Sequence, residues 1–149
     1  MAYANVVVGT DGSVTAELAV RHAGKLAAID GARLVVVTAY TPQGDALVTT
    51  VQGGRDDLRW TLTDRIQAEE SAEYGRKLAN AEGASGVVAQ AVAGAPGDVL
   101  LEVANDFNAD LIVVGSKGLT GAARFVLGSV ASSVSHHAPC DVLVVHTTK

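Results

Sequence analysis

The sequence predicts an α/β protein with three α/β/α layers, a doubly wound sheet of five parallel strands covered by four helices. Two observations carry this prediction. Five short, apolar, mostly β-branched runs recur along the 149 residues, as expected for strands buried on both faces. Longer segments with apolar residues at helical spacing separate these runs. The resulting β-α-β-α order is typical of a sheet built with right-handed crossovers.

The predicted strands are runs of valine, leucine and isoleucine, of which only the third is interrupted by other residues. They span residues 6–8, 34–37, 87–92, 111–114 and 142–145. Because apolar and polar residues do not alternate along these runs, each strand is expected to be covered on both faces.

The predicted helices place apolar residues on one face and span residues 15–28, 63–81, 98–107 and 122–137. In the third, Val99, Leu100 and Val103 share a face. Thr63 or Asp64 could cap the second helix, and Gly83 follows its end. We therefore expect one domain over 1–149.

One stretch, 41–62, has no clear period and contains Pro42, Gly44 and Trp60. A loop of about 20 residues is unusual in a compact domain and is often a lid or a mobile segment. We predict a flexible insert here. Its role as a plain surface insertion or as a ligand- or partner-related segment stays open.

The composition narrows the functional classes. A formal net charge of −5 argues against a broad nucleic-acid interface, because such an interface needs a basic face. No apolar run approaches about 18 residues, so no transmembrane helix is expected. The first residues lack the basic region of a signal peptide, and the single cysteine, Cys140, cannot form an intrachain disulfide. We therefore expect a cytoplasmic protein without a nucleic-acid or membrane partner.

A glycine-rich segment after the fourth strand is the strongest candidate site. It contains Gly115, Ser116, Lys117, Gly118, Gly121, Gly128 and Ser129. Glycines let backbone N–H groups turn toward an anion, and a helix starting near Gly128 or Ser129 would add its positive N-terminus. Ser129 could cap that helix or donate its hydroxyl to a phosphate. Phosphate binding and a plain glycine turn are both compatible with this pattern.

Two other strand ends carry candidates, because ligands of such sheets bind at the carboxyl ends of the strands. Gly9, Thr10 and Asp11 follow the first strand. There Asp11 could contact ribose hydroxyls or Mg²⁺, or serve ordinary turn and capping chemistry. Ala39, after the second strand, could form an apolar wall for a base or simply pack in the core. P-loop, dinucleotide-binding and G-x-S-x-G motifs are absent from the sequence.

The pattern Gly115-x2-Gly118-x9-Gly128-Ser129 resembles the G-2x-G-9x-G(S/T) signature of ATP-binding universal stress proteins. Four further segments are similar to that family in the same order: 6–13, Gly94-Ala95-Pro96, 108–115 and 138–145. The resemblance therefore covers essentially the whole chain.

The resemblance implies a fold like that of the adenine nucleotide α-hydrolases, with strand order 3-2-1-4-5. It also implies a homodimer paired through the last strand, 142–146, which begins at Val142 and ends at His146. By position, Gly9, Thr10 and Asp11 would line the nucleoside, and Ala39 would meet adenine. The loop 115–121, with Lys117 as a positive charge, would hold the phosphates together with Ser129 and Val130. Asp11 would reach a metal only as part of Mg-ATP.

The function implied is that of an ATP-binding stress-response sensor or regulator, with cAMP as the alternative ligand. No general base can be named for hydrolysis, so little or no catalysis is expected. A slow ATP hydrolase or phosphotransferase is a second hypothesis. A protein-interaction module in which the nucleotide is structural is a third.

Overall fold

The computed structural model describes residues 2–41, 54–116 and 128–147, with the backbone alone over 54–63. It contains a five-stranded parallel sheet in the order β3-β2-β1-β4-β5, which confirms the predicted fold class. The strands are β1 (Asn5–Gly9), β2 (Arg33–Tyr40), β3 (Val88–Ala93), β4 (Leu111–Gly115) and β5 (Asp141–Val145). Val7 of the central strand pairs with Val35 on one side and Ile112 on the other.

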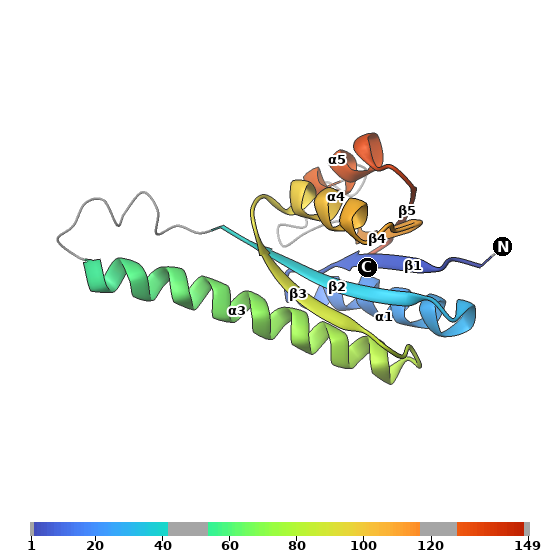
Figure 1. Ribbon diagram of the computed structural model, residues 1–149, viewed down its shortest axis with the longest axis horizontal. Coiled ribbons are helices and arrows are strands. Elements are labelled where there is room, and N and C mark those ends of the chain that lie inside the picture. Colours follow the sequence, from blue (N-terminus) through green and yellow to red (C-terminus); the bar gives the residue numbers. More distant parts are fainter. Residues whose placement is uncertain (1, 42–53, 117–127, 148–149) are drawn as a thin grey trace.

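Helices cover both faces of the sheet. They are α1 (Val14–Asp30), α3 (Gly54–Ala81), α4 (Pro96–Asp106) and α5 (Ser129–His137). Figure 1 shows α4 and α5 on one side of the sheet and α1 and α3 on the other. The three predicted layers are therefore present. Of the helices described, none is long and apolar enough to cross a membrane.

The core is aliphatic and lies on both faces of the sheet. Val6 and Val8 of β1 are buried toward α1 and α3, whereas Val7 between them is buried toward α4 and α5. Successive side chains of a strand point to opposite faces, which explains why the continuous valine run is needed.

One buried polar group on β2 lacks a hydrogen-bond partner within the part of the chain that is described. It is the hydroxyl of Thr38, a residue only 5% exposed. A buried polar group without a partner costs stability, so Thr38 is a weak point of the sheet.

The amino end of β1 is fastened by carboxylates. Asp110 accepts hydrogen bonds from the backbone N–H groups of Ala4 and Asn5, each 2.9 Å long. Asp30 accepts from the N–H of Tyr3 at 2.9 Å. Burial alone would raise the pKa of Asp110, but the two backbone N–H groups hold that pKa below its ordinary value.

β5 is the last strand of the sheet, and its outer edge is not paired with another strand among the described residues. The carbonyl of Val145 accepts a hydrogen bond from the N–H of Ser116, so Val145 points its backbone groups toward β4. Backbone groups of successive residues point to opposite sides of a strand. The N–H of Val144 therefore points away from β4, where the described residues contain no further strand.

Two predicted helix starts are wrong. The helix predicted from residue 63 begins at Gly54, so residues 54–62 are helical although the sequence predicts a flexible insert over 41–62. Its first turns are rich in charged residues and begin with a glycine, so no apolar period marks the start. The rest of that insert, 42–53, lies outside the described residues.

The last helix was predicted over 122–137. Gly128 is extended, with φ −60° and ψ 158°, and the helix begins at Ser129, as the alternative start proposed. Gly128 is also the N-cap residue, so the capping role considered for Ser129 is wrong. Residues 117–127 lie outside the described part of the chain.

Candidate functional site

A cavity lies at the carboxyl ends of the strands, where the chain reverses its direction of winding. β1 leads into α1 on one face of the sheet, and its neighbour β4 leads toward α5 on the other face. Such a switch point leaves a crevice between the diverging connections. The cavity has a volume of about 340 Å³.

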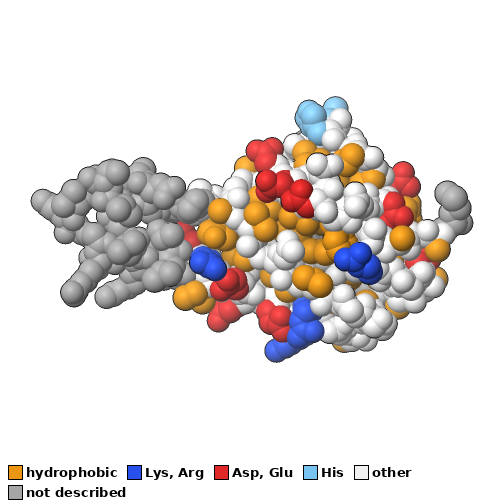
Figure 2. All heavy atoms as spheres, viewed as in Figure 1, with side chains coloured by type: hydrophobic (Ala, Val, Ile, Leu, Met, Phe, Trp, Pro, Cys, Tyr) orange, Lys and Arg blue, Asp and Glu red, His pale blue; other side chains and the backbone are white. Residues whose placement is uncertain are grey.

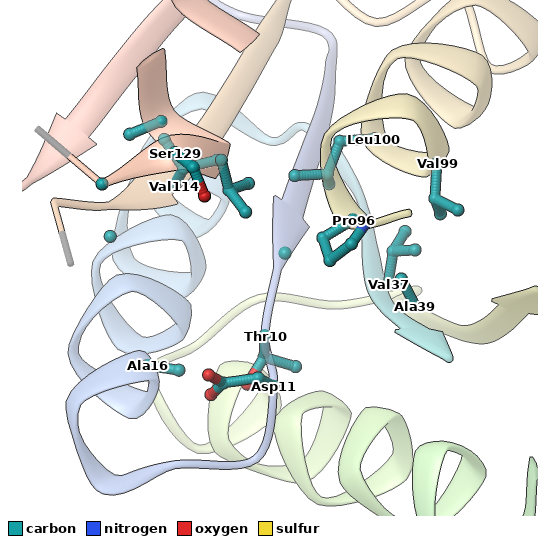
Figure 3. Close-up of a pocket in the computed structure, with 15 residues that line it drawn as sticks. Thr10, Asp11, Ala16, Val37, Ala39, Pro96, Val99, Leu100, Val114 and Ser129 are labelled. Carbon is teal, nitrogen blue, oxygen red and sulfur yellow. The ribbon is translucent and has the colours of Figure 1, made fainter. Parts of the chain in front are cut away.

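The residues around the cavity come from six helices and strands and the turns beside them, and they are mostly small or apolar. They are Gly9, Thr10, Asp11, Ala16, Val37, Ala39, Pro96, Val99, Leu100, Val114, Gly115, Gly128, Ser129, Val130 and Ala131. Asp11 is the one ionisable residue in this set. Figure 3 shows the α4 and β2 side chains on one side of the end of β1, with Val114 and Ser129 on the other.

One wall of the cavity is apolar. Val37 and Ala39 come from the carboxyl end of β2, and Pro96, Val99 and Leu100 come from the first turns of α4. A Cβ at Gly9 would lie 3.0 Å from Leu100, so the absence of a side chain at Gly9 gives Leu100 its space. This wall suits a flat apolar group.

The polar side is built by the turn between β1 and α1. The hydroxyl of Thr10 accepts from the N–H of Gly12 at 3.1 Å, and Asp11 Oδ1 accepts from the N–H of Ser13 at 2.9 Å. The Ser13 hydroxyl in turn accepts from the N–H of Ala16 and caps α1. Gly12 has φ +83°, a conformation that favours glycine. These bonds hold the Asp11 carboxylate in place at the mouth of the cavity.

Two helix N-termini border the cavity without a side-chain cap. Ala95 precedes α4 and Gly128 precedes α5, and neither residue makes a capping hydrogen bond through a side chain. The first N–H groups of a helix have no partner within the helix and carry a partial positive charge. The first residue of α4, Pro96, has no N–H, and Asp98 in the first turn of α4 is acidic. The hydrogen-bond donors and positive potential that the cavity presents to an anion therefore belong mainly to the N-terminus of α5.

Most of the site residues predicted from the sequence lie on this cavity. They are Gly9, Thr10, Asp11, Ala39, Gly115, Gly128, Ser129 and Val130. Ser116 follows Gly115 but does not line the cavity; its hydroxyl instead contacts Thr147. Lys117, Gly118 and Gly121 lie outside the described residues.

Sequence reasoning missed the apolar half of the site. The missed lining residues are Ala16, Val37, Pro96, Val99, Leu100, Val114 and Ala131. Val99 and Leu100 had been noted only as the buried face of a helix, which is also correct. Among these residues, Pro96 was the one that the sequence could have marked as part of the site. It belongs to the Gly94-Ala95-Pro96 segment of the family resemblance, and it starts α4.

Fold and cavity together define a doubly wound α/β protein with a cavity at its switch point. The model of the universal stress protein family matches residues 2–146. A universal stress protein of Mycobacterium tuberculosis is 40% identical over 148 residues, which are 99% of each chain. The chain therefore belongs to the universal stress protein family.

Two solved structures are similar over their full length. The crystal structure of a universal stress protein in complex with cAMP has a TM-score of 0.73 and 38% identity, covering 99% of this chain and 100% of that one. The structure of the universal stress protein from Archaeoglobus fulgidus in complex with dAMP has a TM-score of 0.67 and 27% identity, covering 97% and 98%. Both relatives hold adenine nucleotides.

Proposed function

We propose that this protein binds ATP in the cavity and acts as a stress-response regulator through nucleotide binding rather than turnover. The observation that carries the proposal is an apolar wall beside the uncapped N-terminus of α5. An adenine nucleotide has the complementary parts, namely a flat base, a polar sugar and anionic phosphates. Adenine would lie against Ala39 and Val99, the ribose near Asp11, and the phosphates at the start of α5.

Support for the phosphate end comes from α5. Ser129 occupies the first helical position, lines the cavity and is exposed. Since Gly128 is the N-cap residue, the Ser129 hydroxyl is not used to cap the helix. It can donate a hydrogen bond to a phosphate oxygen, next to the first N–H groups of the helix.

We propose ATP rather than cAMP as the ligand because the glycine signature from Gly115 to Ser129 is complete and includes Lys117. The cAMP and dAMP held by the two relatives make a monophosphate the main alternative. Asp11 suits Mg²⁺ only when phosphate oxygens supply the other ligands, because Mg²⁺ usually binds one or two carboxylates together with substrate phosphates. Among the described residues, no group of three or more His, Cys, Asp or Glu side chains is placed to hold a metal ion.

Slow hydrolysis is the second candidate function, and the cavity offers few groups that could catalyse it. Asp11 is the one ionisable side chain among the described residues that line the cavity. In a hydrolase, Asp11 could position or activate water. Turnover that is lost in Asp11→Ala, with nucleotide affinity kept, would favour the hydrolase.

The proposal includes a homodimer paired through β5 and a cytoplasmic location. An exposed edge strand that stays unpaired promotes aggregation, and a second copy of β5 would satisfy its outward backbone groups.

On the face shown in Figure 2, Lys and Arg side chains are scattered among Asp and Glu rather than gathered into a basic patch. This distribution supports a small-molecule partner over a nucleic acid. The single cysteine, Cys140, suits a reducing compartment.

Calorimetric titration with ATP, ADP, AMP and cAMP, each with and without Mg²⁺, tests the proposal. We expect ATP to bind most tightly, Mg²⁺ to strengthen its binding, and no appreciable phosphate to be released. Asp11→Asn should reduce the effect of Mg²⁺, whereas Glu102→Gln, on the exposed side of α4, serves as a matched control. Tighter binding of cAMP than of ATP would overturn the choice of ligand. Absence of binding to all four would overturn the proposed function.

A further inference from the structure

Ser116 sits at the junction of three segments, and all of its polar groups are used there. Its N–H donates to the carbonyl of Val145 at 2.8 Å, and its carbonyl accepts from the N–H of Gly128 at 2.9 Å. Its hydroxyl accepts from the N–H of Thr147 at 3.1 Å and lies 3.3 Å from the Thr147 hydroxyl. One residue thus joins the end of β4, the start of α5 and the segment after β5.

Thr147 lies in the segment after β5 and is only 2% exposed. A buried polar side chain needs hydrogen-bond partners, and Ser116 is one of the partners of Thr147. The segment after β5 is therefore held against the molecule at this point.

Gly128 connects the hydrogen bonds of Ser116 with the cavity, because it is bonded to Ser116 and lines the cavity. Ser116 holds Gly128 through its carbonyl, and the carbonyl of Gly128 accepts the first helical hydrogen bond, from the N–H of Ser132 at 2.9 Å. Ser129 follows Gly128 directly, and both residues line the cavity. Ser116 is thus hydrogen-bonded both to Gly128, at the N-terminus of α5, and to Thr147.

We propose that Thr147 and Ser116 are positioning residues for the phosphate end of the nucleotide site. This inference rests on the proposed function and goes beyond it, because it makes affinity depend on a residue after the last strand. The favourable effect of a helix N-terminus falls off within one turn, so a small displacement of α5 weakens phosphate binding. Val37, Ala39 and Val99, at the base end of the cavity, belong to β2 and α4 and do not take part in these hydrogen bonds.

Affinity for ATP compared with affinity for adenosine separates positioning from general destabilisation. Ser116→Ala removes the hydroxyl and both contacts with Thr147, and Thr147→Val removes only the Thr147 hydroxyl. We expect Ser116→Ala to weaken ATP binding about tenfold and Thr147→Val to weaken it about threefold, with adenosine binding nearly unchanged. Thr147→Ser keeps the hydroxyl and should restore the wild-type affinity. Ser135→Ala, an exposed serine of the same helix, is the matched control.

Amide hydrogen exchange without ligand gives a second readout. The N–H of Gly128 should exchange several times faster in Ser116→Ala than in the wild type, while that of Val99 in α4 should not change. Equal losses for ATP and adenosine, or wild-type ATP affinity in Ser116→Ala, would overturn the inference and leave the proposed function intact. A wild-type protein that binds neither ligand would overturn the proposed function and this inference with it.

Discussion

Replacing Ser129 by alanine tests the phosphate end of the site without disturbing the fold. Ser129 is the first residue of α5, its side chain is exposed, and the helix is preceded by Gly128 rather than capped by a side chain. The hydroxyl is therefore not needed for the helix, and alanine is a better helix former than serine. We expect the free energy of unfolding to change by less than about 0.5 kcal/mol.

The expected loss of affinity follows from the bond that the hydroxyl would make. A hydrogen bond to a charged group contributes about 1.5–3 kcal/mol, and the exposure of Ser129 places it at the lower end. Because about 1.4 kcal/mol corresponds to a factor of ten in Kd, ATP affinity should fall about tenfold. Adenosine affinity should not change, since adenosine has no phosphate.

Calorimetry of the wild type, Ser129→Ala and the control Ser135→Ala with both ligands provides the measurement. Unchanged ATP affinity in Ser129→Ala would refute a phosphate contact at this position. An equal loss for adenosine would place the ribose or base, not the phosphates, at the start of α5.

Three further predictions concern stability and assembly. Asp110→Asn should lower the free energy of unfolding at pH 7 by about 1 kcal/mol in urea titrations. Since the folded pKa of Asp110 is depressed, this difference should shrink as the pH falls below its ordinary value of 3.8; a constant difference would contradict the assignment. Thr38→Val should raise stability by about 1 kcal/mol, because it removes a buried hydroxyl without a partner among the described residues; a comparable loss would contradict this. Val144→Pro should convert a dimer into monomer or aggregate in light scattering after size exclusion, and a persisting dimer would exclude pairing through β5.

The fold could be predicted because its signals are local and strong. The valine runs 6–8 and 34–37 are too continuous for strands with one exposed face, and the structure buries both of their faces. The strand order came from the family resemblance rather than from periodicity. The start of α3 at Gly54 was missed because its charged first turns show no apolar period.

The candidate site could be predicted only where a short motif marks it. Gly9, Asp11 and Ser129 stand at strand and helix ends, so their positions follow from topology. Val99 and Leu100 could not be separated from ordinary core residues, because the same apolar pattern covers a core and lines a cavity. Ser116 was placed on the cavity by the motif. Its contact with Thr147 spans 31 positions in sequence, and no local pattern reveals such a contact.

The central claim is that the cavity at the carboxyl ends of β1 and β4 binds an adenine nucleotide. Nuclear magnetic resonance of the labelled protein during an ATP titration tests it most directly. We predict that the amide signals of Gly9, Asp11, Ala39 and Ser129 shift in a saturable way. The signal of Asn5, at the opposite end of β1, should stay in place. Saturable shifts confined to the amino end of the sheet, or no saturable shift at all, would contradict the account.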